Sequence, residues 1–141
     1  MKITIVGCGV IGGSFALALK RQRPECTIAC LDLPERLPAI REAGVADYVG
    51  TMEDFKEHVP DSSIVLLATP VQSLLETLAR LRPFLRENTI VTDVGSTKKK
   101  IMTEAPKLLP AGVHFIGGHP MAGSERSGVE ASDALLFSER V

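Results

Sequence analysis

Short, continuously apolar runs alternate with helical stretches along the whole chain, and this alternation limits the fold more than any other feature. The runs are rich in Val and Ile, which is typical of strands covered on both faces. Strands are predicted at KITIVG (2–7), TIACLD (27–32), ADYVG (46–50), SIVLLAT (63–69), TIVTDV (89–94) and VHFIGG (113–118). Helices are predicted over 11–22, 35–43, 71–82 and 98–109, with a short one over 52–59. We therefore expect an α/β fold with a doubly wound, mostly parallel sheet.

The chain is short and nearly neutral, and both properties exclude classes of function. Its 141 residues correspond to one domain. Sixteen basic and seventeen acidic residues give a formal net charge of −1, so the basic excess of a nucleic-acid-binding protein is missing. No apolar run approaches the roughly 18 residues of a membrane span, and the start MKITIVGCG is typical of a first strand rather than a signal peptide. We expect neither nucleic-acid nor membrane partners.

Glycines follow the first predicted strand at a spacing typical of dinucleotide-binding domains. Gly7, Gly9 and Gly12 form a G-x-G-x-x-G pattern between a strand and a helix. In such a Rossmann-type domain the first glycine makes the tight turn, the second admits a pyrophosphate and the third lets the helix pack on the strand. The first helical amides, here those of Val10 and Ile11, then face the phosphates.

An acidic residue at the end of the second strand completes this pattern. Asp32 lies 20 residues beyond Gly12, where a carboxylate accepts hydrogen bonds from the adenosine ribose and repels a 2′-phosphate. This predicts NAD rather than NADP as the cofactor, although Arg36 lies close enough in sequence to leave NADP open. The plainer alternative is a glycine turn with a capping aspartate.

Polar residues also follow the fourth and fifth predicted strands, at the edge where such sheets bind ligands. Thr69 is expected to lie beside the cofactor, and Pro70 to start the next helix at its first position. A simple strand-to-helix turn accounts for both residues equally well. Ser96 or Thr97 is expected to cap the next helix, and Lys98 is a candidate for attracting an anionic substrate.

A histidine follows the sixth predicted strand in the stretch FIGGHPMAGSE. Pro120 favours an extended conformation at His119, and the glycines at 117–118 leave space around it. Connectivity brings this loop to the half of the sheet where a nicotinamide lies, so His119 can take a proton as an alcohol loses hydride. Ser96, one strand away, is predicted to hydrogen-bond both the imidazole and the substrate hydroxyl. The alternative is a structural role for the histidine.

The remaining cysteines and histidines suggest no further site. Cys8, Cys26 and Cys30 lack the spacing of a disulfide framework or a metal site, so we expect buried thiols in the reducing cytoplasm and no metal. His58 is expected at the surface, and His114 inside a strand as a structural residue with its hydrogen bonds satisfied.

Three stretches resemble the prephenate/arogenate dehydrogenase family of tyrosine biosynthesis: VGCGVIGGSFALALK, VTDVGSTKKKI and FIGGHPMAGSERSGVEAS. The similarity runs from Lys2 to about Phe137, and the second and third stretches are more specific than the glycine loop. It implies NAD-dependent oxidative decarboxylation of prephenate or arogenate, in which hydride leaves the ring carbon that bears the hydroxyl and loss of carbon dioxide makes the product aromatic.

The resemblance also assigns roles to residues. His119 matches the histidine that hydrogen-bonds the hydroxyl and assists its deprotonation, and Ser96 matches a serine that contacts the same hydroxyl. Ser124 and Glu125 fall on the substrate-side loop. Family members continue into a helical domain that forms a homodimer and binds the substrate carboxylates. We therefore expect residues 1–141 to be the dinucleotide-binding domain, without that helical domain and unable to complete the reaction alone.

Three other functions stay open at this point. One is another hydride-transfer enzyme on this fold, acting on a small hydroxy acid or an imine. Another is a non-catalytic NAD-binding sensor, which has no need of His119. The third is an S-adenosylmethionine-dependent methyltransferase, which also uses a glycine loop and an acidic strand end but does not bind NAD.

Overall fold

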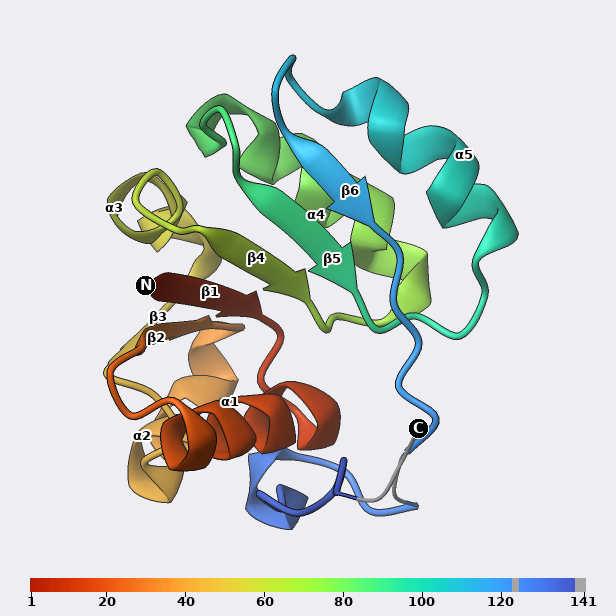
Figure 1. Cartoon of the computed structure of the whole chain (residues 1–141). Coiled ribbons are helices and arrows are strands. Elements are labelled where there is room, and N and C mark those ends of the chain that lie inside the picture. Colours follow the sequence, from red (N-terminus) through yellow and green to blue (C-terminus); the bar gives the residue numbers. More distant parts are fainter. Residues whose placement is uncertain (123–124, 139–141) are drawn as a thin grey trace.

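The computed structural model describes residues 1–122 and 125–138 and contains a six-stranded parallel sheet (Figure 1). The strands are β1 (Lys2–Val6), β2 (Thr27–Leu31), β3 (Tyr48–Gly50), β4 (Ile64–Leu67), β5 (Ile90–Asp93) and β6 (His114–Ile116). Their order is β3-β2-β1-β4-β5-β6, and each neighbouring pair is parallel. The chain thus starts in the middle of the sheet and winds outward twice, which confirms the doubly wound α/β fold.

Each predicted helix is present, although several begin with a 3₁₀ turn. The α-helices are α1 (Val10–Gln22), α2 (Leu37–Ala43), α3 (Phe55–His58), α4 (Leu74–Leu81) and α5 (Lys99–Leu108). The 3₁₀ turns are η1 (Pro34–Arg36), η2 (Met52–Asp54), η3 (Val71–Ser73), η4 (Arg82–Phe84) and η5 (Val129–Ala131). Gly44 ends α2 in the left-handed conformation, with φ of 64°, where a residue without Cβ is favoured.

Helices cover the sheet on both faces and enclose two apolar cores. Figure 1 shows α1 and α2 on one side of the sheet, and α4 and α5 on the other. On the α1 side, Ile5 and Ile28 pack with Ala16 and Ile40. On the α4 side, the core contains side chains from β4, β5, α4 and α5: Val65, Leu67, Val91, Leu74, Leu78, Ile101 and Ala105. Burial on both faces explains why the strands are continuous apolar runs.

The α1-side face is less covered over β5 and β6 than over the first strands. Along β5, Ile90 and Thr92 are half-buried while Val91 and Asp93 are buried. In β6, Ile116 is 55% exposed and His114 is also exposed. His114 lies inside a strand, as predicted, but its side chain is exposed because an edge strand exposes one of its faces where no helix covers it.

The last described segment returns across the sheet to the first half of the molecule (Figure 1). Val129 of η5 is buried against the core between α1 and α2, and the Ser14 hydroxyl accepts a hydrogen bond from the Asp133 amide at 2.9 Å. Phe137 meets Phe15 of α1 edge-on, with ring centroids 6.1 Å apart. The loop that carries His119 is therefore anchored at both of its ends. Among the described helices, none is long and apolar enough to cross a membrane.

Candidate active site

The carboxyl ends of β1, β2 and β4 border a cavity of about 540 Å³. Its wall includes the glycine loop, the end of β2 and the start of the β4–α4 connection: Gly7, Gly9, Asp32, Thr69 and Pro70. Because the order of strands reverses between β1 and β4, this is the position where doubly wound sheets bind ligands. The structure brings these predicted residues together.

The conformation of the glycine loop explains its spacing. Gly7 has φ of 92°, and a Cβ there would lie 2.7 Å from the carbonyl carbon of Ala68. A Cβ on Gly12 would lie 2.1 Å from the carbonyl oxygen of Gly7, so α1 packs on the loop only with glycine at that position. A Cβ on Gly9 would meet no atom within 4 Å. Its exposed face therefore points into open space, where a ligand can approach the backbone.

The amino end of α1 presents free amide donors to an adjoining cavity, which shares Gly9 with the first and is also lined by Val10 and Ile11. Gly9 is the N-cap residue, no side chain caps the helix, and its first turn contains no acidic residue. The amides of Val10 and Ile11 therefore remain available, as the first amides of a helix lack intrahelical acceptors. Together with the helix dipole they form a site for an anion.

Asp32 is a buried carboxylate with acceptor capacity left over. Its side chain belongs to a residue only 3% exposed. Oδ2 accepts a hydrogen bond from the Cys8 amide and Oδ1 from the Leu33 amide, both at 2.7 Å. Within the described ranges, no cationic group lies within 4.0 Å of it. Since a carboxylate accepts about four hydrogen bonds, Asp32 can accept further bonds from the hydroxyls of a ligand.

Thr69 and Pro70 complete this half of the site. The Thr69 hydroxyl is buried and has no hydrogen-bond partner in the described part of the chain, which is unusual unless a ligand or water supplies one. Pro70 has φ of −53° and ψ of 144° and precedes η3. The expectation that it occupies the first helical position is therefore wrong, because its extended ψ places it at the N-cap.

The second half of the site is organised by an aspartate that the sequence analysis did not single out. Asp93, at the end of β5, accepts hydrogen bonds from the Gly95 amide at 2.9 Å and the Gly118 amide at 3.2 Å. It also forms a short ion pair with Lys98. Lys98 is thus held by Asp93 rather than free to attract a substrate. An aspartate inside an apolar strand is the signal that indicates such a buried pairing.

Ser96 and Thr97 do not cap α5, so that expectation is wrong. The N-cap residue is Lys98, and no side chain caps the helix. Ser96 and Thr97 lie in the preceding loop and are exposed. The bonds from Asp93 to Gly95 and Lys98 hold this loop in its conformation.

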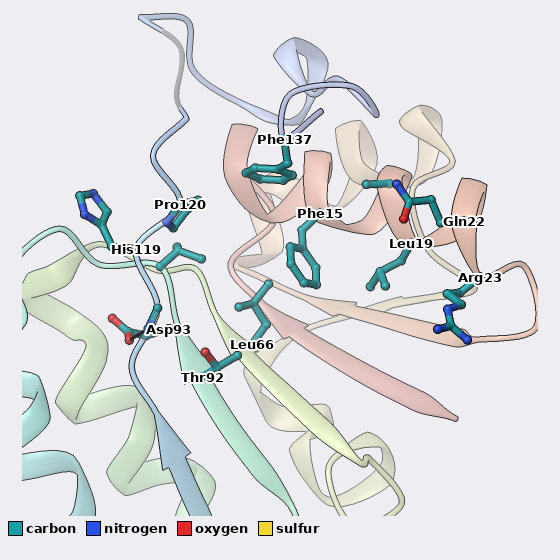
Figure 2. Close-up of a pocket in the computed structure, with 13 residues that line it drawn as sticks. Phe15, Leu19, Gln22, Arg23, Leu66, Thr92, Asp93, His119, Pro120 and Phe137 are labelled. Atoms are coloured by element: carbon teal, nitrogen blue, oxygen red, sulfur yellow. Dashed lines mark hydrogen bonds between the residues drawn. The ribbon is translucent and has the colours of Figure 1, made fainter. Parts of the chain in front are cut away.

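His119 is exposed and lies at the rim of a second cavity, of about 570 Å³, together with Asp93, Pro120 and Phe15. Figure 2 shows its imidazole directed away from Phe15 and Phe137, on the far side of the loop from α1. Within the described residues, no hydrogen bond joins His119 to Ser96. The two side chains thus lie on neighbouring loops, and the predicted hydrogen bond between them is not present among the described residues.

The substrate-side loop is described only in part. Ser124 lies outside the described residues, and Glu125 is exposed. Arg36 and Arg126 line a third cavity beside the first turn of α1, together with Val10 and Ile11. Arg36 also lines the cavity that contains Asp32, so its closeness to Asp32 in sequence corresponds to a shared cavity. No motif near the glycine loop indicates Arg126.

The cysteines are buried, as predicted. The thiols of Cys8 and Cys30 lie 2.9 Å apart across β1 and β2, a contact that sequence spacing does not indicate. The interaction with Cys8 and burial both raise the pKa of the Cys30 thiol, which keeps it protonated. The described residues contain no group of three side chains arranged to hold a metal ion.

The family described as prephenate dehydrogenase, nucleotide-binding domain, matches residues 15–141 by its sequence profile. The chain belongs to the prephenate dehydrogenase family. The matched residues begin after the glycine loop, so the loop is an indication independent of the match, whereas Asp32 falls within the matched residues.

Individual prephenate dehydrogenases agree with this assignment. The chain is 40% identical over 137 residues to prephenate dehydrogenase of Bacillus subtilis and 39% identical over 138 residues to that of Lactococcus lactis. These matches cover 96% of this chain but only 36% and 38% of the relatives. The chain therefore spans less than half the length of these two relatives.

Solved structures of family members have the same fold. Prephenate dehydrogenase of Aquifex aeolicus, in complex with hydroxyphenyl propionate and NAD⁺, superposes with a TM-score of 0.89 at 34% identity. The superposition covers 99% of this chain and 48% of the Aquifex aeolicus chain. Arogenate dehydrogenase of Synechocystis gives a TM-score of 0.85 at 34% identity, covering 96% and 46%. Both the fold and the family resemblance expected from the sequence are thereby confirmed.

Proposed function

We propose that this chain is the NAD-binding domain of a dehydrogenase that oxidatively decarboxylates prephenate or arogenate. The single observation that carries the proposal is the pairing of two polar strand ends across the switch point. On one side, buried Asp32 keeps free acceptor capacity beside the glycine loop. On the other, His119 and Ser96 lie exposed on loops joined through Asp93. One side suits a dinucleotide, and the other suits chemistry on a substrate hydroxyl.

The residues of the first half fit NAD. Asp32 accepts hydrogen bonds from the ribose diol, and the amides of Val10 and Ile11 bind the pyrophosphate. The open face of Gly9 admits the phosphates closely. The buried Thr69 hydroxyl, which lacks a protein partner, gains one from the cofactor. When bound, NAD supplies the hydride acceptor.

The residues of the second half act on the substrate. His119 accepts the proton of the ring hydroxyl as a general base, and Ser96 hydrogen-bonds the same oxygen and fixes its position. From the family resemblance we also assign Ser124 and Glu125 to substrate binding; Glu125 is exposed, and Ser124 lies outside the described residues. The loss of carbon dioxide then yields an aromatic product, which makes the reaction favourable.

We further infer that residues 1–141 are one domain of the intact protein, which supplies the rest of the substrate site and a homodimer contact from a helical domain. The relatives support this inference because they are more than twice as long as the matched region. The protein is assigned to the cytoplasm, where a biosynthetic dehydrogenase with buried, reduced thiols functions.

The test uses the intact protein and follows NADH at 340 nm with prephenate or arogenate. We expect His119→Asn to lower kcat by roughly 10²–10⁴, the usual contribution of a general base, while the Kd for NAD stays within about threefold. The matched control is His114→Asn, five residues earlier on the exposed face of β6, which should leave kcat unchanged. Equal activity of His119→Asn and the unmutated protein would refute the role of His119. No turnover of either substrate by the unmutated protein would refute the function.

A further inference from the structure

Asp93 is the centre of a group of contacts that joins three segments. Its residue is 1% exposed, and each carboxylate oxygen has a partner. Oδ2 accepts from the Gly95 amide and forms the short ion pair with Lys98, while Oδ1 accepts from the Gly118 amide. Gly118 is 25 residues from Asp93 in sequence, so this contact links β5 to the loop after β6.

The amides held by Asp93 directly precede the two candidate reactive side chains. Gly95 is followed by Ser96, and Gly118 is followed by His119. Both glycines lie so close to Asp93 that a side chain at either position would collide with it. A Cβ on Gly118 would lie 2.6 Å from the Asp93 carbonyl oxygen, and one on Gly95 would lie 2.9 Å from Oδ2. The glycines and the aspartate therefore form one arrangement that fixes both loops.

Lys98 neutralises the carboxylate from the start of α5. Its side chain is 27% exposed, whereas that of Asp93 is fully buried. The stem of Lys98 lies along the histidine loop, since a Cβ on Gly117 would be 3.7 Å from its Cδ. Burying a lone carboxylate is costly, and a paired one that accepts several hydrogen bonds is far less so. The pair thus keeps a net charge away from the loop of His119.

We propose that Asp93 is a positioning residue for the reaction: it fixes the Ser96 and His119 loops relative to each other, and its ion pair with Lys98 keeps their surroundings neutral. The proposal rests on the proposed function of Ser96 and His119. It follows that Asp93 affects turnover through geometry and local charge and does not contact the substrate. A misplacement of about 1 Å is enough to lower a rate about 10²-fold.

The test compares variants of the intact protein. Asp93→Asn removes the charge but not the shape, and the matched control is Asp47→Asn. Asp47 also accepts a strand amide, that of Ile28 at 2.8 Å, and pairs with Lys20 at 3.5 Å, but at the opposite edge of the sheet. For each variant we would measure kcat, KM, the Kd for NAD, the midpoint of thermal unfolding, and amide exchange in peptides containing Gly95 and Gly118.

We expect Asp93→Asn to lower kcat about 10²-fold and to speed amide exchange in both glycine-containing peptides, with the Kd for NAD within about threefold. Asp47→Asn should change none of these beyond about twofold. Retention of more than half of kcat by Asp93→Asn, or equal losses in both variants, would overturn the proposal. Should Asp93→Asn fail to fold, Gly118→Ala displaces the loop with both charges intact, and retained kcat in that variant would overturn it equally.

The pH dependence of kcat separates positioning from general damage. Among the described residues, the charged groups near the histidine loop include Asp93 on β5 and Lys98 at the start of α5, with Arg23 of α1 on the far wall of the cavity. Glu125 and Arg126 follow in the same connection. Asp93→Asn leaves a net positive charge and should move the pH of half-maximal kcat downward, on the order of 0.5 units. Lys98→Met leaves a negative charge and should move it upward. Shifts in the same direction, or none, would refute the electrostatic part.

The two proposals fail in different ways. If the unmutated intact protein turns over neither prephenate nor arogenate, the proposed function fails. In that case the amide exchange of Asp93→Asn still decides whether Asp93 couples the two loops, since exchange is measured without substrate. If the unmutated protein is active and the variant is equally active, only the positioning role fails.

Discussion

Two buried aspartates end strands on opposite sides of the switch point, and they differ in what their carboxylates bind. Asp32 and Asp93 are 3% and 1% exposed, and each accepts two backbone amides. Asp93 also has Lys98 as a counter-ion, whereas no cationic group of the described residues lies within 4.0 Å of Asp32. The two aspartates are therefore almost equally buried, but only Asp93 has a counter-ion among the described residues.

This difference indicates which of the two carboxylates is available to bind a ligand. A carboxylate with a counter-ion and amide donors on both oxygens is engaged within the protein, so Asp93 organises loops. A carboxylate without a counter-ion keeps a cost of burial that hydroxyl donors of a ligand can offset. In the proposed function, the half of the sheet around Asp32 binds the cofactor, and the half around Asp93 holds the loops of Ser96 and His119.

The largest expected effect tests whether the binding half depends on the tight glycine loop. Gly12→Ala places a Cβ 2.1 Å from the Gly7 carbonyl oxygen, and backbone crowding of this kind costs roughly 3 kcal/mol of unfolding free energy. Gly9→Ala meets no neighbour within 4 Å and should leave stability almost unchanged while it weakens NAD binding. Urea unfolding and calorimetric titration of NAD check both variants. Equal stability of the two would contradict the packing argument.

The second effect concerns the free acceptors of Asp32. Asp32→Ser removes the charge that pairs with the ribose hydroxyls and repels a 2′-phosphate. We expect the preference for NAD over NADP to fall about 30-fold, which corresponds to about 2 kcal/mol. Calorimetric titration of both nucleotides with the intact protein measures it. Equal affinity of the unmutated protein for NAD and NADP would refute this role for Asp32.

The third effect compares the two aspartates directly through stability. Asp93→Asn leaves the Lys98 ammonium without its counter-ion and should lower the unfolding free energy by about 1–2 kcal/mol. Asp32→Asn leaves no cation without its counter-ion and should change the unfolding free energy by less than about 1 kcal/mol. Denaturant unfolding at low and high salt checks both. A larger loss in Asp32→Asn than in Asp93→Asn would reverse the comparison.

The smallest expected effect concerns the loss of stability in acid, which we attribute to His58 rather than to Asp32 or Asp93. Burial, followed by the charge of Lys2, lowers the pKa of His58 below its usual 6.5. The fold therefore favours the neutral imidazole, so stability is full above about pH 6.5 and falls as the pH drops below that value. Melting temperatures between pH 7.5 and 5.5 should decline less in His58→Asn. An unchanged slope would assign the loss to other groups.

Local patterns predicted much of the binding half because its parts lie close together in sequence. The glycine spacing and the distance to Asp32 indicate the loop and its acidic partner without knowledge of any distant contact. Alternation of apolar runs likewise predicted all six strands, with ends trimmed by one or two residues. His58 was expected at the surface, yet its Nδ1 atom is buried without a partner among the described residues.

The other half was predicted less well because its contacts are long-range. The roles of Lys98, Ser96 and Thr97 were predicted from their position before a helix. In the structure, the buried Asp93 at the end of β5 pairs with Lys98 and also accepts a hydrogen bond from the distant Gly118 amide. His114 was assigned by its place in a strand, yet β6 is an edge strand with an exposed face. Which side chains an edge exposes depends on what packs there, and no local pattern contains that information.

The strand order also has a consequence for how the protein forms during synthesis. β1 meets its first neighbour early, since Lys2 pairs with Thr27, but its second neighbour only when Ile64 reaches Ile3. At about 5–20 residues per second, translation of the residues between Leu31 and Ile64 takes roughly 2–6 s. Throughout that interval the central strand has one unpaired edge, which can pair with another nascent chain. The stretch 32–63 must therefore be made before the central strand of the sheet can be paired on both sides.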